Sequence, residues 1–283
     1  MKSIIKAFSL VLAASAFALA CAPKAPIGSA SPTPPTAYDD MSEYNEWADS
    51  YGYEHGELTS EGSSGLYMDR FMTLSSDAAY YSGRIVIGDS RCCQLGIYQM
   101  RAESAGFAAF AVWGGHFRNG SYPPIMTDTL VSEIENCFKK QIEAHGSSTV
   151  FFFATVNDYD YASGDNGGNI AAAICAAERI ASMEYEYNGR IHRPKVIIIG
   201  FDGSIKEGSL WGGLSAEVFN RYVSDYNAAL KAAVEASALL KENSDRFTTV
   251  PEIVGETGFI TDLLHYDDIT LGKLCEFIIN AAE

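Results

Sequence analysis

The stretch IVIGDSRCCQLG, residues 85–96, joins an apolar strand-like run to a helical pattern and carries a serine between them. Glycine permits the tight turn that such a junction needs, and a serine hydroxyl displayed there can act as a nucleophile. The hydroxyl is a weak nucleophile until a base takes its proton, so Ser90 needs a histidine from elsewhere in the chain. Without that histidine, Ser90 is better interpreted as the cap of a helix.

A candidate base lies near the C-terminal end, where FITDLLHYDD places Asp262 three residues before His265. An imidazole accepts a proton near neutral pH, and a carboxylate on its other ring nitrogen holds the tautomer that faces the serine. His265 could equally be a surface histidine, and Asp262 could be the N-cap of a helical turn. A shared location with Ser90 would distinguish the two interpretations.

Two further polar segments directly follow apolar strand-like runs, WGGH at residues 113–116 and ND at residues 157–158. In open parallel sheets, functional groups collect beyond the carboxyl ends of the strands. We therefore expect both segments to lie beside Ser90. Taken alone, Asn157 is typical of a turn after a strand.

Taken together, these segments resemble the SGNH (GDSL-type) hydrolase superfamily over residues 84–283. Its members carry Gly-Asp-Ser after the first strand, a glycine after the second, Gly-x-Asn-Asp after the third and Asp-x-x-His near the C-terminus. The corresponding segments here are GDSR (88–91), WGGH (113–116), TVND (155–158) and DLLH (262–265). Arg91 replaces the common leucine, as in a bacterial extracytoplasmic branch, and Thr155 replaces the glycine of the third motif.

The resemblance implies a serine esterase or acylhydrolase that acts through an acyl-serine intermediate, without a metal or an organic cofactor. Its catalytic residues would be Ser90, Asp262 and His265. Its oxyanion hole would use the backbone N–H groups of Ser90 and Gly115 and the side-chain amide of Asn157. Such donors are worth about 3–4 kcal/mol each. The adjacent Gly114 is the alternative to Gly115.

Four residues near the expected site are candidate substrate contacts: Arg91, Trp113, His116 and Tyr159. Arg91 could bind a substrate carboxylate or phosphate, or it could form a salt bridge with a local acid. His116 could contact substrate or have a structural role, and the two aromatic residues could stack on a sugar ring. We expect Asp89 and Asp158 to hold the loops through backbone hydrogen bonds.

Short apolar runs alternate with helical patterns over the C-terminal 200 residues. The strand-like runs are 84–88, 107–113, 148–155, 195–200 and 246–250. The helical patterns are 91–105, 127–144, 169–187, 215–242 and 269–282. Runs that are apolar throughout are typical of strands buried on both faces. The alternation predicts a three-layer α/β/α sandwich with a five-stranded parallel sheet, and the resemblance implies the flavodoxin-like SGNH hydrolase fold.

The N-terminal part of the chain divides into three segments ahead of the domain at 84–283. Residues 1–21 have a basic start, an apolar run and small residues before a cysteine, which is typical of a secretory signal. The segment resembles a bacterial lipoprotein signal, which implies lipid attachment at Cys21 and an extracytoplasmic, envelope-anchored protein; ordinary cleavage after Ala20 is the alternative. The composition of residues 22–37 predicts a Pro/Ser-rich tether. Residues 38–83 are predicted to form an acidic extension, whose aromatic residues pack on the domain or line a cleft.

The net charge limits the partners of this protein. The formal charge is −16, and removal of the first 21 residues, which hold two lysines and no acidic residue, leaves −18. Because such a surface repels phosphate backbones, we expect no nucleic-acid partner. The expected partners are a small-molecule or glycan ester and, through the lipid, a membrane, and we expect a monomer.

The cysteines show no zinc-site spacing, and no metal is expected. Cys92 and Cys93 are adjacent, so a disulfide between them would be strained. Two interpretations are open at this point: one disulfide between Cys92 or Cys93 and a distant cysteine, or buried free thiols for most of the cysteines.

The expected activity is cleavage of an O-acetyl or short acyl ester on a carbohydrate. An O-acyltransferase would use the same residues. A catalytically silent surface carbohydrate-binding module on the same fold is the alternative from another class.

Overall fold

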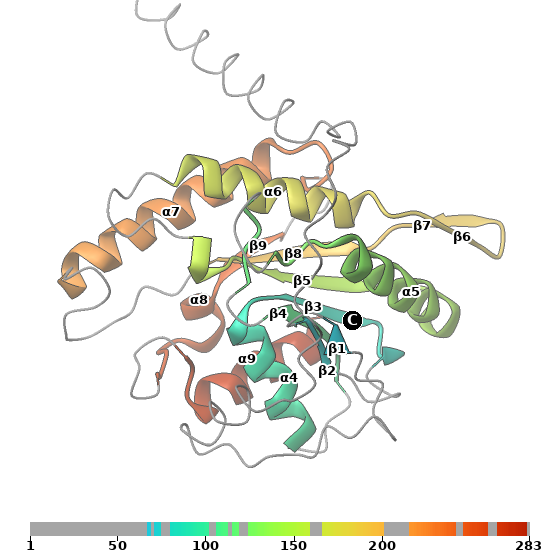
Figure 1. The fold of residues 1–283 in the computed structure, drawn as a ribbon, viewed down its shortest axis with the longest axis horizontal. Coiled ribbons are helices and arrows are strands. Elements are labelled where there is room, and N and C mark those ends of the chain that lie inside the picture. The colour runs from blue at the N-terminus through green and yellow to red at the C-terminus, as the bar shows by residue number, and fades with distance from the viewer. Residues whose placement is uncertain are drawn as a thin grey trace, which may run out of the picture.

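The computed structural model describes residues 67–68, 71–74, 80–101, 106–112, 115–118, 124–158, 166–200, 215–241, 246–259 and 265–281. Within this part of the chain the main element is a seven-stranded sheet, in the order β1-β2-β4-β3-β5-β8-β9 (Figure 1). Its five strands from β4 to β9 are parallel. The predicted α/β class and five-stranded parallel sheet are therefore confirmed.

The parallel strands are β3 (Arg84–Gly88), β4 (Ala108–Val112), β5 (Thr149–Phe153), β8 (Lys195–Gly200) and β9 (Phe247–Thr249). Every residue of β4 and β5 is buried, because helices cover both faces of the sheet. Two short strands from the segment expected as an extension, β1 (Tyr67–Met68) and β2 (Phe71–Leu74), lengthen the sheet. They do so antiparallel, with β2 paired to β4.

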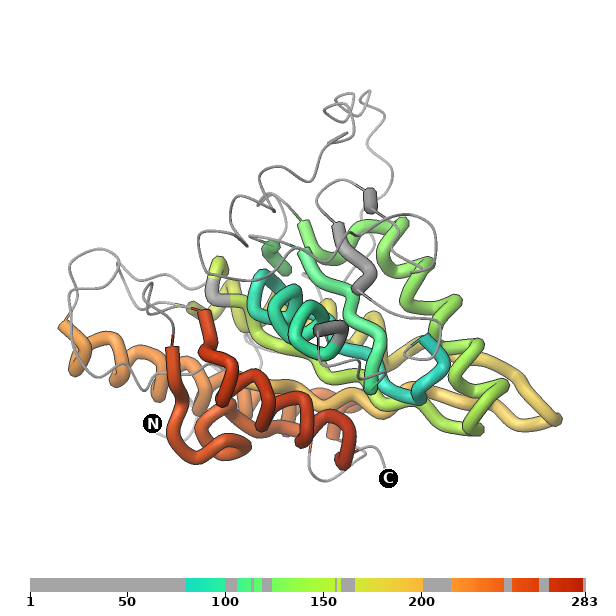
Figure 2. Tube along the Cα trace, turned by 90° about the horizontal axis from the view of Figure 1, so that it is seen from below, coloured from blue at the N-terminus to red at the C-terminus, as the bar shows by residue number. Residues whose placement is uncertain are grey.

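Helices lie on both faces of the sheet. The upper face in Figure 1 carries α5 (Asp128–His145), α6 (Gly167–Ala181) and α7 (Ala216–Ala236). The lower face carries α4 (Ser90–Arg101), α8 (Val250–Val254) and α9 (Asp268–Asn280). Figure 2 shows α4 and α9 side by side on this face. No helix in the described residues is long and apolar enough to cross a membrane.

The alternation of side chains along β3 explains the layers. Ile85 and Ile87 belong to the core under α5, α6 and α7, whereas Val86 belongs to the core under α4, α8 and α9. Successive residues of a strand point to opposite faces, so one apolar strand supplies both cores. Continuous apolar runs in the sequence are the result.

The order of the parallel strands locates the site. Numbered along the chain, the five strands lie in the order 2-1-3-4-5, which is the flavodoxin-like order of doubly wound sheets. The chain leaves β3 toward one side and later crosses to its other side to form β5. Ligands of such sheets bind outside the carboxyl ends of the strands at this reversal. Ser90 lies two residues after the end of β3.

The predicted helix over residues 169–187 is wrong at its C-terminal end. Helix α6 ends at Ala181, and β6 (Tyr185–Tyr187) and β7 (Arg190–His192) form an antiparallel hairpin. Asn188 and Gly189 both have positive φ, 52° and 74°, as a two-residue hairpin turn of type I′ requires. The Asn-Gly pair, preceded by alternating Tyr-Glu-Tyr, was the sequence signal for this turn.

The cysteines of the described residues form no disulfide. Cys92 and Cys93 are fully buried in the core between the sheet and α4 and α9, so the buried-thiol interpretation holds for both. Burial raises the pKa of both thiols well above the ordinary value, and Asp89 nearby raises the two pKa values further. These thiols are therefore apolar packing groups.

Candidate active site

The turn from β3 into α4 depends on Gly88 and Asp89. A Cβ atom on Gly88 would lie 2.4 Å from the Sγ of Cys92 and 3.1 Å from the Cβ of Phe153, so glycine lets the helix start close to the sheet. The Oδ1 of Asp89 accepts a hydrogen bond from the backbone N–H of Arg91 at 3.1 Å, which is the contact of an N-cap residue. The cap fixes Ser90 as the first residue of α4.

Ser90 is 6% exposed. The N–H groups of a first helical turn have no acceptor within the helix, and they carry the positive end of the helix dipole. The Ser90 N–H therefore points out of α4 at the reversal of the sheet. This is the arrangement that an oxyanion donor requires.

His265 meets Ser90 at this point. Its Nε2 lies 3.0 Å from the Oγ of Ser90, although 175 residues separate the two in sequence. His265 is only 4% exposed. The distance is that of a nucleophile and its general base. The structure thus brings together the predicted nucleophile and the predicted base. Asp262 lies outside the described residues, and its role stays a prediction.

The prediction that Gly115 supplies an oxyanion N–H is not supported by the geometry. The N–H of Gly115 donates to the carbonyl of Val112 at 2.9 Å, which closes the turn after β4. A Cβ atom here would lie 2.5 Å from the Cγ1 of Ile125 and 2.8 Å from the Cβ of Val112. Gly115 is therefore needed for close packing of a turn. The alternative, Gly114, lies outside the described residues.

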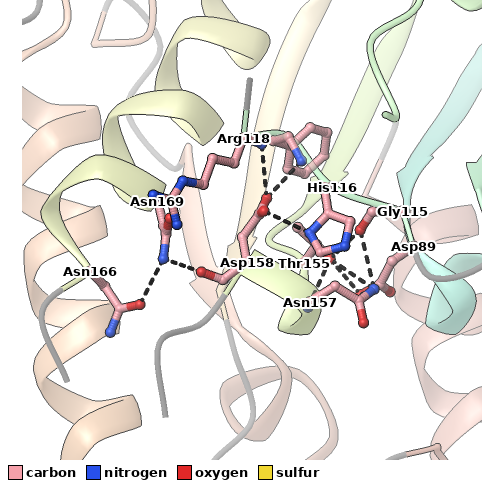
Figure 3. A network of polar contacts seen from close by, with 10 residues as sticks. Asp89, Gly115, His116, Arg118, Thr155, Asn157, Asp158, Asn166 and Asn169 are labelled. Carbon is pink, nitrogen blue, oxygen red and sulfur yellow. Dashed lines mark hydrogen bonds and ion pairs between the residues drawn. The ribbon is translucent and has the colours of Figure 1, made fainter. Parts of the chain in front are cut away.

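Asn157 lies beside the predicted site, in the 3-10 turn η1 (Val156–Asp158) after β5. Its Nδ2 is 3.1 Å from the carbonyl oxygen of Gly115, 3.3 Å from the Oγ1 of Thr155 and 3.4 Å from the Oδ2 of Asp89 (Figure 3). An amide nitrogen has two protons to donate. To donate to an oxyanion, the Asn157 amide would therefore have to give up one of its two longer contacts, to Thr155 or to Asp89.

Thr155 has a role that was not predicted from the sequence, where it stands out only as a departure from the third motif. Its Oγ1 lies 2.8 Å from the Oδ2 of Asp89 and 2.9 Å from the carbonyl oxygen of Gly115, and it accepts a hydrogen bond from the backbone N–H of Asn157 at 3.1 Å. It is 1% exposed. One side chain thus connects the loops after β3, β4 and β5. The signal in the sequence was a hydroxyl residue two positions after the end of β5, where the motif that this segment resembles has glycine.

Asp158 holds the loop at residues 115–118. Its carboxylate accepts hydrogen bonds from the backbone N–H groups of Phe117 at 2.6 Å and Arg118 at 3.2 Å, and lies 3.0 Å from the Nδ1 of His116 (Figure 3). Burial raises the pKa of Asp158, and these contacts partly oppose the rise. The side chain of His116 is 21% exposed, so it contacts Asp158 on one side and solvent on the other.

Arg91 does not lie where a substrate contact was expected. It is 5% exposed, its Nη1 donates to the hydroxyl of Tyr266 at 3.2 Å, and its Cζ lies 4.9 Å from the centre of the Tyr266 ring. The guanidinium is directed into the protein because an aromatic face and a hydroxyl satisfy it there. Two other candidate contacts, Trp113 and Tyr159, lie outside the described residues.

The chain matches no protein-family model, no curated protein and no solved structure. The described residues contain no cluster of three or more His, Cys, Asp or Glu that could hold a metal ion. What they do contain is a serine at a helix N-terminus with an imidazole on its hydroxyl. That pair has the parts needed for nucleophilic catalysis through a covalent serine intermediate.

Proposed function

We propose that this protein is an exported serine hydrolase of the SGNH type, lipid-anchored at Cys21, that cleaves a carboxylic ester. The observation that carries the proposal is the 3.0 Å contact between the Oγ of Ser90 and the Nε2 of His265. The position of Ser90 at the start of α4, beyond the strand where the sheet order reverses, supports it further.

In the proposed reaction, the Nε2 of His265 takes the hydroxyl proton as the Oγ of Ser90 attacks the ester carbonyl carbon. The carbonyl oxygen becomes an oxyanion, stabilised by the Ser90 N–H and the positive end of α4. The imidazolium then returns the proton to the alkoxide as the ester C–O bond breaks. Water repeats the sequence on the acyl-serine and releases the acid. Asp262 would accept the Nδ1–H of His265 and stabilise the imidazolium.

The proposed substrate is an O-acetyl or short acyl group on a carbohydrate, which rests on the resemblance and on the expected export. Release of acetate from an acetylated glycan, measured against release of fatty acid from a lipid ester, tests this choice. Transfer of the acyl group to a sugar hydroxyl in place of water would identify an O-acyltransferase. Mass spectrometry of the acceptor sugar distinguishes transfer from hydrolysis.

A second candidate is a catalytically silent surface carbohydrate-binding module. Two hydrogen bonds favour it, because they engage two groups expected to stabilise the oxyanion: the N–H of Gly115 donates to Val112, and the amide of Asn157 donates to Gly115. An inert module would keep these internal bonds. An enzyme would have to release the N–H of Gly115, turn an Asn157 amide proton away from one of its longer contacts, or rely on the start of α4 alone.

A fluorophosphonate probe separates the two candidates, because it reacts with a serine only where a base activates the hydroxyl. The hydrolase requires labelling of the wild-type protein at Ser90 that is lost in Ser90→Ala. Ser132→Ala, on the exposed side of α5, is the matched control and should label like the wild type. A folded wild-type protein that stays unlabelled would favour the binding module.

A further inference from the structure

The residue that follows His265 is held to the helix that carries Ser90. The backbone N–H of Tyr266 donates to the Oε1 of Gln94 at 3.2 Å, and the Nε2 of Gln94 lies 3.5 Å from the carbonyl oxygen of Tyr266. One side-chain amide thus binds both polar groups of one main-chain residue. Gln94 is fully buried and Tyr266 is 1% exposed, so neither contact competes with water.

The spacing on α4 explains why these contacts bear on the nucleophile. Ser90 and Gln94 are four residues apart, so they lie on the same face of the helix, one turn from each other. The first contacts His265 and the second contacts Tyr266. A single helix face therefore binds two successive residues of the C-terminal loop.

The side chain of Tyr266 is fixed as well. The guanidinium of Arg91 binds its hydroxyl and lies over its ring, and the ring of Phe259 lies 5.8 Å away on a backbone bridge between residues 259 and 266. Gln94, Arg91 and Phe259 together restrain the main chain, the ring and the hydroxyl of residue 266. Because residues 265 and 266 share a peptide bond, this restraint also limits where the imidazole can lie.

We propose that Gln94 and Arg91 are positioning residues that set the imidazole of His265 on the hydroxyl of Ser90 by holding Tyr266 against α4. The proposal rests on the proposed hydrolase function and goes beyond it. It gives Arg91, the residue after the nucleophile, a role in orienting the base. It also makes the alignment of the pair depend on α4 itself, in addition to any support from Asp262.

Gln99 offers a matched control on the same helix. Its Oε1 accepts from the backbone N–H of Phe107 at 3.1 Å, and its Nε2 donates to the carbonyl of Phe107 at 2.7 Å, so it holds a main-chain residue in the same way. Phe107 directly precedes β4, at the opposite end of the sheet from Ser90. Gln99→Met and Gln94→Met should therefore have similar effects on stability and different effects on catalysis.

The experiment measures kcat and KM for an activated acetyl ester, together with the rate of fluorophosphonate labelling. In Gln94→Met, kcat and the labelling rate should fall between about tenfold and about a hundredfold, the order of loss that a misplacement of roughly 1 Å causes. KM should stay close to the wild-type value, and Gln99→Met should keep the wild-type kcat. Equal kcat in the two variants would overturn the proposal, whereas an unlabelled wild-type protein would overturn the hydrolase function instead.

Gln94→Glu is a second variant that tests the same proposal if Gln94→Met does not fold. The introduced carboxyl can donate to the carbonyl of Tyr266 only while it is protonated, and its ionised form repels that oxygen. The kcat of Gln94→Glu relative to the wild type should therefore fall as pH rises through the pKa of the introduced group. A ratio that stays constant with pH would overturn the positioning role.

Discussion

The hydroxyl of Thr155 lies 2.8 Å from the Oδ2 of Asp89, and this contact ties the loop after β5 to the N-cap of the helix that begins with Ser90. The same hydroxyl lies 2.9 Å from the carbonyl of Gly115. A hydroxyl has one proton and can donate to only one of these oxygens at a time. Thr155 therefore couples the geometry of three loops through a shared proton.

Removing this hydroxyl should loosen the site. Thr155→Val keeps the shape but loses the bond to Asp89, so we expect a loss of about 1–3 kcal/mol in the free energy of unfolding, the usual effect of removing a partner from a buried polar group. Thr155→Ser retains the hydroxyl and should lose less. Urea unfolding of the three proteins checks this, and a valine variant as stable as the wild type would contradict it.

Gly88→Ala should displace the start of α4. The added Cβ would lie 2.4 Å from the Sγ of Cys92, and overpacking of this kind costs about 1–3 kcal/mol of folding stability. Adding Cys92→Ala removes that sulfur and should recover part of the loss, because the two substitutions share one contact. Gly168→Ala in α6, where nothing lies within 4 Å of an added Cβ, is the control and should not destabilise. Strict additivity in urea unfolding would argue against the clash.

His265→Ala should abolish ester turnover while the protein stays folded. Without the imidazole no group takes the Ser90 proton during attack, and we expect kcat to fall by at least about a thousandfold. His192→Ala, on the hairpin away from the carboxyl ends of the strands, should retain full turnover. Circular dichroism establishes that both variants fold. Retained turnover in His265→Ala would show that another group is the base.

Because its thiols are buried, the protein should lose free energy of unfolding at alkaline pH. Burial raises the pKa of Cys275 from the ordinary 9.0 to about 12, so the folded state keeps its proton where the unfolded chain has lost it. The resulting stabilisation is complete below pH 9 and is lost as pH rises toward 12, at up to about 1.4 kcal/mol per pH unit. Cys275→Ala should show a shallower decline in the free energy of unfolding between pH 9 and pH 10.5. Parallel curves for the two proteins would contradict the prediction.

Local sequence was sufficient for most of the secondary structure. Thr127 and Ser215 precede helical patterns and are the N-caps of α5 and α7, with side chains that accept from the N–H groups of Leu130 and Val218. Helix caps and buried strands could be predicted correctly because each depends on residues within one helical turn or one strand. The first strand of the hairpin was missed because the helical pattern was extended from Ala181 to Tyr187, across residues that form β6.

The sequence by itself determined which functional groups are available for chemistry: a serine and an amide after buried strands, and a histidine near the C-terminus. Only the tertiary structure decided which of these groups meet. Strand order put Ser90 and His265 within 3.0 Å, and the turn after β4 directed the N–H of Gly115 to Val112. Packing against Tyr266 turned Arg91 inward. Contacts between residues far apart in the chain depend on strand order, register and side-chain packing, and no local pattern encodes those.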